Sequence, residues 1–272
     1  MSRWRPDVLA LGLSADTLAG SAAHAAAPAG GWAAASLQDA LQVIRPAPAG
    51  QPARLLLCPD LCKHFAQPPS AGLRALGELR ALAALRAGQL FGGPPQAWAV
   101  VADWSLTQPM VCAAMPSALL DALRQVARQL RLALSVESAA LAALAALSRQ
   151  PLPLSLSHPQ GFVAWASPAH LMLASITDGA VRGLRCMRRP AGAGPAELAA
   201  RAVQESAQYA LRSAAGPALP GAATLVFAWP DAAAAPPAGA ALAIAFDAAG
   251  TLPAPQPAES EAAWACRLAG MS

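Results

Sequence analysis

The pattern of hydrophobic and polar positions repeats one plan in the two halves of the chain. Apolar runs and alternations predict three short extended segments, then a helix with apolar residues at helical spacing, then another strand. In the first half this order falls on residues 8–13, 16–23, 32–35, 37–44 and 54–58. In the second half it falls on residues 162–166, 170–176, 180–187, 195–212 and 224–229. The repetition predicts two similar α/β units.

Local signals mark the ends of several predicted elements. Asp178-Gly179 lies between two apolar segments and predicts a tight hairpin, because glycine readily takes the positive φ that such turns need. Ser36 is expected to cap the first helix. Arg201 and Glu205 are expected to form an i, i+4 pair on the helix of the second half.

The stretch at about 59–115 departs from this plan. A helix at 71–90 is expected there, followed by strands at Trp98 to Trp104 and Pro109 to Met115. These elements predict an α+β subdomain inserted into the first half. Leucines recur every three residues along the helix and therefore wind around it, which predicts packing on more than one side.

The rest of the first half and the linker complete the organisation. An amphipathic helix at 117–130, a strand at 131–136 and a helix at 138–147 are expected, and Gln150 to Pro159, with prolines at 151, 153 and 159, predicts the link between halves. We therefore expect a first lobe at 1–150 and a second lobe at 151–272. The second lobe is expected to have a flexible Ala/Pro-rich C-terminal part before a short helix at 259–268.

Composition narrows the class of protein. Of the 272 residues 56% are hydrophobic, but alanine supplies much of that fraction, and polar residues or proline interrupt every apolar run before it could cross a bilayer. We therefore expect no membrane span. The net charge is +4, yet Lys63 is the only lysine and the arginines are scattered, so a nucleic-acid partner is not expected either. The five cysteines lack metal-ligand spacing and are expected to be reduced.

The order of elements resembles the actin-like ATPase superfamily, and within it the PilM family of pilus-assembly proteins and the cytoplasmic part of the GspL family of type II secretion proteins. The residues that carry the local resemblance run from Met110-Val-Cys-Ala-Ala-Met-Pro116 through the amphipathic helix to Arg131-Leu-Ala-Leu-Ser-Val-Glu137 and the helix after it. The resemblance implies an α/β fold of two RNase H-like (actin-like) lobes with an inserted α+β subdomain in the first half.

The same resemblance shows what this chain lacks. Actin-like ATPases place Asp-x-Gly in the first hairpin, and the matching residues here are Ala10-Leu11-Gly12, so the glycine is present but the carboxylate is not. The second such motif is replaced by Ala164-Trp165-Ala166, and Pro230-Asp231 stands where a glycine pair is expected. We therefore expect no nucleotide cofactor, no metal and no ATP hydrolysis.

Other candidate chemistry is weak. Gly192-x-Gly194 lies between a strand and a helix but lacks the rest of any phosphate-binding fingerprint, and the four histidines show no metal spacing. Asp60 and Asp103 are either paired acids or a turn cap and a strand end. The arginines at 185, 188 and 189 are either a solvated strand end or a contact for an anion or partner. We predict no catalytic, cofactor-binding or metal-binding residue.

Trp98 and Trp104 are the candidate partner-binding residues. They have the same parity along one predicted strand, so their rings are expected on one face, either in the core or in an apolar groove beside the Leu-rich helix. A PilM-like protein is expected to bind the cytoplasmic tail of a membrane partner in such a groove.

The function we expect is a non-catalytic, cytoplasmic scaffold of a type IV pilus or type II secretion inner-membrane platform. Its partners would be an inner-membrane platform protein, which holds it at the membrane periphery, and a motor ATPase. The alternative is a divergent nucleotide-binding ATPase or a small-molecule enzyme on the same fold.

Overall fold

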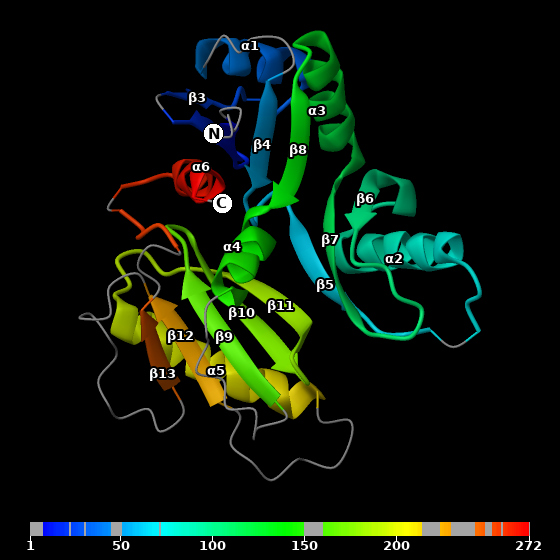
Figure 1. Cartoon of the computed structure of the whole chain (residues 1–272), viewed down its shortest axis with the longest axis vertical. Helices are drawn as coiled ribbons and strands as arrows, with labels where there is room; N and C mark the ends of the chain where they lie inside the picture. The colour runs from blue at the N-terminus through cyan, green and yellow to red at the C-terminus, as the bar shows by residue number, and fades with distance from the viewer. Residues whose placement is uncertain are drawn as a thin grey trace, which may run out of the picture.

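A computed structural model describes residues 8–21, 23–29, 31–44, 51–70, 72–149, 160–213, 224–229, 243–247, 252–256 and 258–271. Within these residues the chain forms two five-stranded sheets and one three-stranded sheet with helices packed on them (Figure 1). The two five-stranded sheets confirm the repeated plan of the sequence.

The first sheet consists of β1 (Leu9–Leu13), β2 (Thr17–Gly20), β3 (His24–Ala26), β4 (Pro52–Leu57) and β8 (Ala133–Ser138). Their order is β3-β2-β1-β4-β8, with β1–β2–β3 antiparallel and β1, β4 and β8 parallel. Leu9, Leu11 and Leu13 pack with α1 (Ala34–Ile44) and α3 (Ser117–Gln129). The opposite side of β1 meets α6 (Glu261–Gly270).

The second sheet has the same topology. It consists of β9 (Gln160–Ala166), β10 (His170–Thr177), β11 (Ala180–Arg188), β12 (Thr224–Trp229) and β13 (Ala243–Asp247) in the order β11-β10-β9-β12-β13. β9, β10 and β11 are antiparallel, whereas β9, β12 and β13 are parallel. One side of β9 packs on α5 (Pro195–Ser213) through Phe162 and Ala164.

Two helices pack between the sheets. α4 (Ala139–Ser148) and α6 share one core with Leu56 of the first sheet and with Val163 and Trp165 of the second. Ser138 caps α4 by accepting a hydrogen bond from the backbone N–H of Leu141 (3.3 Å). α6 contacts β1, β2 and β4, so a helix that follows the second sheet in sequence lies against the first (Figure 1).

The insertion forms a separate small layer. β5 (Lys63–Gln67), β7 (Met110–Pro116) and β6 (Trp98–Val101) pair in that order, and α2 (Leu76–Phe91) and the short helix η1 (Pro95–Ala97) accompany them. Phe65, Leu79 and Cys112 contribute to the core of this layer. β5 and β7 also contact β11, so the insertion lies against the edge of the second sheet.

Several sequence expectations need correction. The third extended segment of the first half is His24–Ala26 rather than residues 32–35, which lead into α1. β5 was not predicted, and its polar sequence explains why. Ser36 lies inside α1, where its hydroxyl oxygen accepts from the backbone N–H of Ala33 (2.9 Å) in place of capping as the first residue. Glu205 pairs with Arg185 of β11 (3.1 Å) rather than with Arg201.

α2 also differs from expectation. It packs on the three-stranded sheet through Leu79, Ala83 and Ala87, whereas Leu85 and Leu90 are exposed, so packing on several sides is not seen among the described residues. The Asp178-Gly179 hairpin is confirmed, with φ of 51° and 71°. The linker at 150–159 and most of the Ala/Pro-rich stretch lie outside the described residues. The division at 150/151 therefore remains a proposal.

Candidate functional site: the cleft between the lobes

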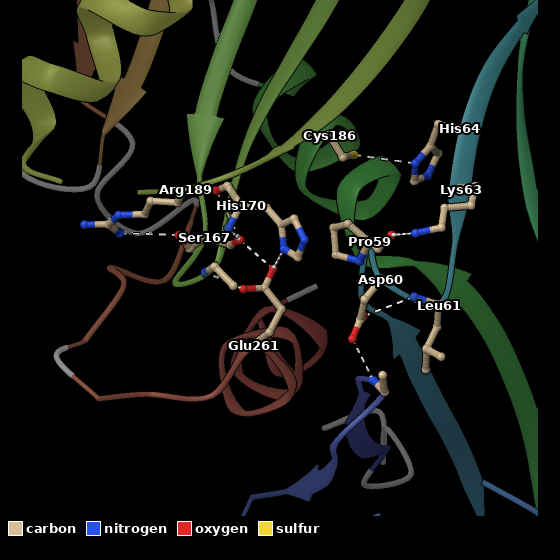
Figure 2. Close-up of polar contacts among 12 residues, drawn as sticks. Pro59, Asp60, Leu61, Lys63, His64, Ser167, His170, Cys186, Arg189 and Glu261 are labelled. Carbon is tan, nitrogen blue, oxygen red and sulfur yellow. Dashed lines mark hydrogen bonds and ion pairs between the residues drawn. The ribbon is translucent and has the colours of Figure 1, made fainter. Parts of the chain in front are cut away.

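The candidate site is a cleft of about 840 Å³ between the two five-stranded sheets. Its walls come from the β1–β2 turn, the segment after β4, the β9–β10 turn, the end of β11 and the start of α6. These are equivalent edges of the two repeated units, together with parts of the insertion and of the C-terminal helix. The cleft is therefore the place where side chains from both halves meet (Figure 2).

The two turns that face this cleft have the same hydrogen bonds. In the β1–β2 turn the N–H of Ser14 donates to the carbonyl of Thr17 (2.9 Å), and the N–H of Thr17 donates to Oγ of Ser14 (3.0 Å). In the β9–β10 turn the N–H of Ser167 donates to the carbonyl of His170 (2.8 Å), and the N–H of His170 donates to Oγ of Ser167 (3.2 Å). The repeated plan extends to these contacts.

The carboxylate of Glu261 occupies the β9–β10 turn. Its Oε1 accepts from Oγ of Ser167 (2.5 Å) and lies 3.2 Å from Nδ1 of His170, and its Oε2 accepts from the backbone N–H of Ala169 (2.8 Å). The Glu261 side chain is 7% exposed and that of His170 is 13% exposed. Three donors of one turn therefore hold a buried carboxylate that α6 supplies (Figure 2).

Asp60 has a related role at the β1–β2 turn. Its carboxylate accepts from the backbone N–H of Ala15 (2.7 Å) and from the N–H of Leu61 (3.0 Å). Asp60 is half-buried on the cleft wall, whereas Asp103 is exposed in the loop after β6. The turn-cap interpretation of Asp60 is therefore confirmed, but Asp103 does not end a strand.

Gly12 is the glycine that the resemblance matched to a phosphate loop, and its open side is filled by α6. A Cβ added at Gly12 would lie 2.0 Å from the carbonyl oxygen of Ala262 and 2.7 Å from the backbone nitrogen of Cys266. Trp165, in the second replaced motif, is fully buried in the core between the sheets. Gly12 and Trp165, which occupy equivalent positions in the two halves, therefore both contribute to packing.

A third group on the cleft wall joins the insertion to the second lobe. His64 Nε2 lies 2.7 Å from Oγ of Ser138 and 4.0 Å from Sγ of Cys62, and its Nδ1 lies 3.6 Å from Sγ of Cys186. Burial, with a smaller effect from the charge of Lys63, lowers the pKa of His64 to about 4. Burial raises the pKa of Cys62 and that of Cys186 to about 12.

These pKa shifts describe uncharged groups at neutral pH. A Cys–His nucleophile needs the thiolate, and here both shifts favour the thiol and the neutral imidazole. The Ser138 hydroxyl already accepts a hydrogen bond as the cap of α4. Hydrogen bonding and packing therefore account for the His64 group.

The arginine cluster is divided between several partners. Arg185 pairs with Glu205, and Arg189 donates to the backbone carbonyls of Ser167 (3.4 Å) and Ala193 (2.6 Å). Arg188 is exposed at the end of β11 and lines the cleft. Among the described residues, no group of three or more His, Cys, Asp or Glu side chains is arranged to hold a metal ion.

Trp98 and Trp104 lie in the insertion, away from the cleft lining. Trp98 Nε1 donates to the carbonyl of Gly92 (2.7 Å), and its ring centroid is 5.5 Å from that of Phe91. Trp104 follows β6 in a loop, so the parity argument does not apply to it, and the guanidinium of Arg80 lies 5.6 Å from its ring centroid. Both rings are half-buried against the core of the insertion.

Sequence reasoning missed Glu261, Ser167 and the His64 group. Glu261 is 94 residues from Ser167, and no local spacing connects them. A usable signal existed in the serines that follow the first strand of each half, Ser14 and Ser167, because they occupy equivalent positions in the repeat.

Comparisons with known proteins identify the fold. No protein-family model matches the sequence. No curated protein matches it either.

None of the described helices is both long enough and apolar enough to span a membrane.

Solved structures share its architecture. PilM from a PilM–PilN type IV pilus biogenesis complex has a TM-score of 0.52 at 13% identity, covering 97% of each chain. A Bacteroides thetaiotaomicron protein with an actin-like ATPase fold and unknown function has a TM-score of 0.50 at 9% identity, covering 82% of this chain and 81% of that one. The cytoplasmic domain of EpsL from the Vibrio cholerae type II secretion system is a weaker likeness, with a TM-score of 0.44 at 10% identity over 94% and 87%. The chain has the actin-like ATPase fold, as its resemblance predicted.

Proposed function

We propose that this protein is a non-catalytic cytoplasmic scaffold of a type IV pilus or type II secretion inner-membrane platform. It binds the cytoplasmic tail of a membrane partner and is held at the inner membrane by that contact, with a motor ATPase as a second partner. The fold similarity to PilM, which is found in a complex with PilN, supports the choice of system.

The observation that carries this proposal is the occupation of both cleft turns by carboxylates of the chain itself. Glu261 and Asp60 accept the backbone N–H groups that point from these turns. A phosphate placed at the β9–β10 turn would meet the buried negative charge of Glu261 at close range, which costs several kcal/mol. This arrangement supports a cleft that does not carry out phosphoryl transfer.

The insertion supports the binding of a partner. Of the large apolar side chains that are exposed among the described residues, four of seven belong to the insertion: Leu76, Leu85, Leu90 and Val101, at 43 to 53% exposure. Trp98 and Trp104 lie half-buried in the same subdomain, and we propose that they contact the partner. Aromatic and aliphatic side chains of this kind are typical anchors at protein interfaces.

A pull-down from solubilised inner membranes of the native host tests the proposal. The immobilised protein is expected to recover pilus or secretion platform proteins. Leu85→Glu, Leu90→Glu and Trp104→Ala should each reduce recovery at least tenfold, because they charge or truncate the proposed surface. Val43→Glu, at a residue that is 69% exposed on α1, is the control and should leave recovery unchanged. Recovery of no such component by folded wild-type protein contradicts the proposal.

The alternative, a divergent ATPase or small-molecule enzyme, is favoured by the size of the cleft and by the basic residues on its wall, among them Lys63 and Arg188. Calorimetric titration with Mg-ATP separates the two. We expect no saturable heat up to millimolar nucleotide. Saturable binding in the micromolar range would replace the scaffold with the enzyme.

A further inference from the structure

The β9–β10 turn holds several donors, and hydrogen bonds within the turn itself contribute to its shape. The backbone N–H groups of Ser167 and His170 each donate a hydrogen bond to the other residue, so these contacts use only residues of the turn. The turn then directs the Ser167 hydroxyl, the Ala169 N–H and the His170 imidazole to one point. Convergent N–H and O–H donors of this kind bind anions in many proteins.

The occupant binds through both of its oxygens. Oε1 of Glu261 contacts the Ser167 hydroxyl and the His170 imidazole, and Oε2 accepts from the backbone N–H of Ala169. Ser167 is fully buried. Without the carboxylate, water could reach its hydroxyl only through the space that Glu261 leaves. The donor set therefore matches a small oxyanion rather than a neutral group.

The carboxylate comes from an element that the other lobe holds. α6 lies against β1 because Gly12 allows close approach, and Ser260 caps it by accepting from the N–H of Ala263 (3.1 Å). Trp264 anchors the same helix by donating to the carbonyl of Pro253 (2.7 Å). The packing of α6 thus keeps the Glu261 carboxylate beside the β9–β10 turn. The effective concentration of this carboxylate at the turn is therefore high.

We propose that the β9–β10 turn is an oxyanion-binding site that this chain fills with its own Glu261, so that one carboxylate latches α6 and the first sheet to the second lobe. Small carboxylates and phosphate take the site only when Glu261 is removed. The inference requires no partner protein, and it shares with the proposed scaffold role only the contact of Glu261 with the turn.

Chemical rescue of Glu261→Ala tests the site. Acetate contains the same heavy atoms that this substitution removes, so it should fill the gap and reach the same donors. We expect the variant to unfold at a lower temperature than wild type. Acetate at about 100 mM, against chloride at equal ionic strength, should raise its Tm by roughly 3 °C if acetate binds with a Kd near 10 mM. Inorganic phosphate is the second probe, and a rise in Tm with it also supports an oxyanion site.

Three controls separate the site from general salt effects. Glu197→Ala removes an exposed glutamate from the first turn of α5. It loses a favourable negative charge at a helix N-terminus, as Glu261→Ala does, but it leaves no set of donors empty. The double variant Glu261→Ala with Ser167→Ala lacks a donor, and Glu261→Gln fills the space with an amide. Acetate should shift the Tm of these three variants and of wild type by less than about 1 °C.

The Ala169 amide supplies a local readout. Its NMR resonance should move and its hydrogen exchange accelerate in Glu261→Ala, and acetate should reverse both changes. If the variant does not fold in chloride, acetate should restore refolding. The proposal is overturned if Glu261→Ala loses no more Tm than Glu197→Ala, if acetate acts equally on the controls, or if acetate neither moves the Ala169 amide nor restores folding.

Discussion

The two turns that face the cleft share their backbone and their serine contacts, but they hold carboxylates of different kinds. At the β1–β2 turn, Asp60 comes from the same lobe and is half-buried. At the β9–β10 turn, Glu261 comes from a helix packed on the other lobe and is 7% exposed. One duplicated turn is therefore capped locally, and its counterpart joins the two halves.

The two contacts differ most in their burial. Burial makes the contact at Glu261 energetically significant, because the Ser167 hydroxyl that donates to this carboxylate is fully buried. The contact at Asp60 is close to solvent, and water replaces it at small cost. The comparison predicts unequal responses to equivalent substitutions.

The largest effect is expected at the strands that lead into the turns. Gly12 and Trp165 both precede the last residue of the central strand of their sheet. Gly12→Ala places a methyl group 2.0 Å from a backbone oxygen of α6, so the helix must move. We expect a loss of at least about 3 kcal/mol in the free energy of unfolding, measured in urea. Gly270→Ala is the matched control, because its Cβ would lie 3.9 Å from Ala10 and should not destabilise. An equal loss in both variants contradicts the packing argument.

The pH dependence is expected to be the next largest effect, and it depends on His64, which touches Ser138 of the first half and Cys186 of the second. Its pKa is 6.5 in the unfolded chain and about 4 in the fold. Between these values the unfolded state binds a proton that the folded state does not. Stability is therefore complete above pH 6.5 and falls as the pH decreases to 4, by about 3 kcal/mol in total.

His64→Gln isolates this contribution, because glutamine keeps a polar group near Ser138 and does not titrate. Urea unfolding of wild type and variant at several pH values is the measurement. The free energy of unfolding of wild type relative to that of the variant should fall by about 3 kcal/mol as the pH decreases from 6.5 to 4. A constant difference across that range would show that folding does not change the pKa of His64 and would contradict this prediction.

Removal of the two carboxylates tests the comparison directly. Glu261→Ala leaves the buried Ser167 hydroxyl unpaired and should cost about 2 to 3 kcal/mol, whereas Asp60→Ala should cost about 1 kcal/mol or less. Both variants are measured by urea unfolding under the same conditions. Equal losses would mean that burial does not distinguish the two turns.

The serines give the smallest contrast. Ser167→Ala loses the hydroxyl that donates to Glu261 and should cost about 2 kcal/mol. Ser14→Ala loses only the contacts inside its own turn and should cost about 1 kcal/mol. A double-mutant cycle of Ser167→Ala with Glu261→Ala should show coupling, and the same cycle of Ser14→Ala with Asp60→Ala should show almost none.

Much of the fold could be predicted from the sequence, because it depends on local periodicity. The apolar stripe of α3, with Leu119, Leu123 and Val126 buried, and the Asp178-Gly179 turn both follow from residues close together in the chain. β5 could not be predicted in this way, since Lys63 and His64 begin it and its apolar residues do not form a run. β3 consists of His24 and two alanines, which favour no element strongly.

The site was harder to predict than the fold, for a physical reason. Its contacts join residues far apart, such as Glu261 to Ser167 and His64 to Cys186, whose side chains meet only after both lobes and the insertion have packed. The absence of the phosphate motifs was visible in the sequence. What replaced them was not, because Gly12 in isolation does not reveal that a helix from residues 261–270 lies on it.

The contact between α6 and β1 also has a consequence for biosynthesis. Cys266 donates to the carbonyl of Ala10, and the two residues are 256 positions apart. A ribosome needs roughly 15 to 50 s to make that length of chain. The strands at the start of the first sheet therefore leave the ribosome well before α6, and the face that α6 covers stays exposed during that time. During that interval the nascent chain exposes an apolar surface suited to chaperones or to wrong pairing. Completion of the N-terminal lobe is therefore a late, long-range event, which predicts slow maturation for a protein of this size.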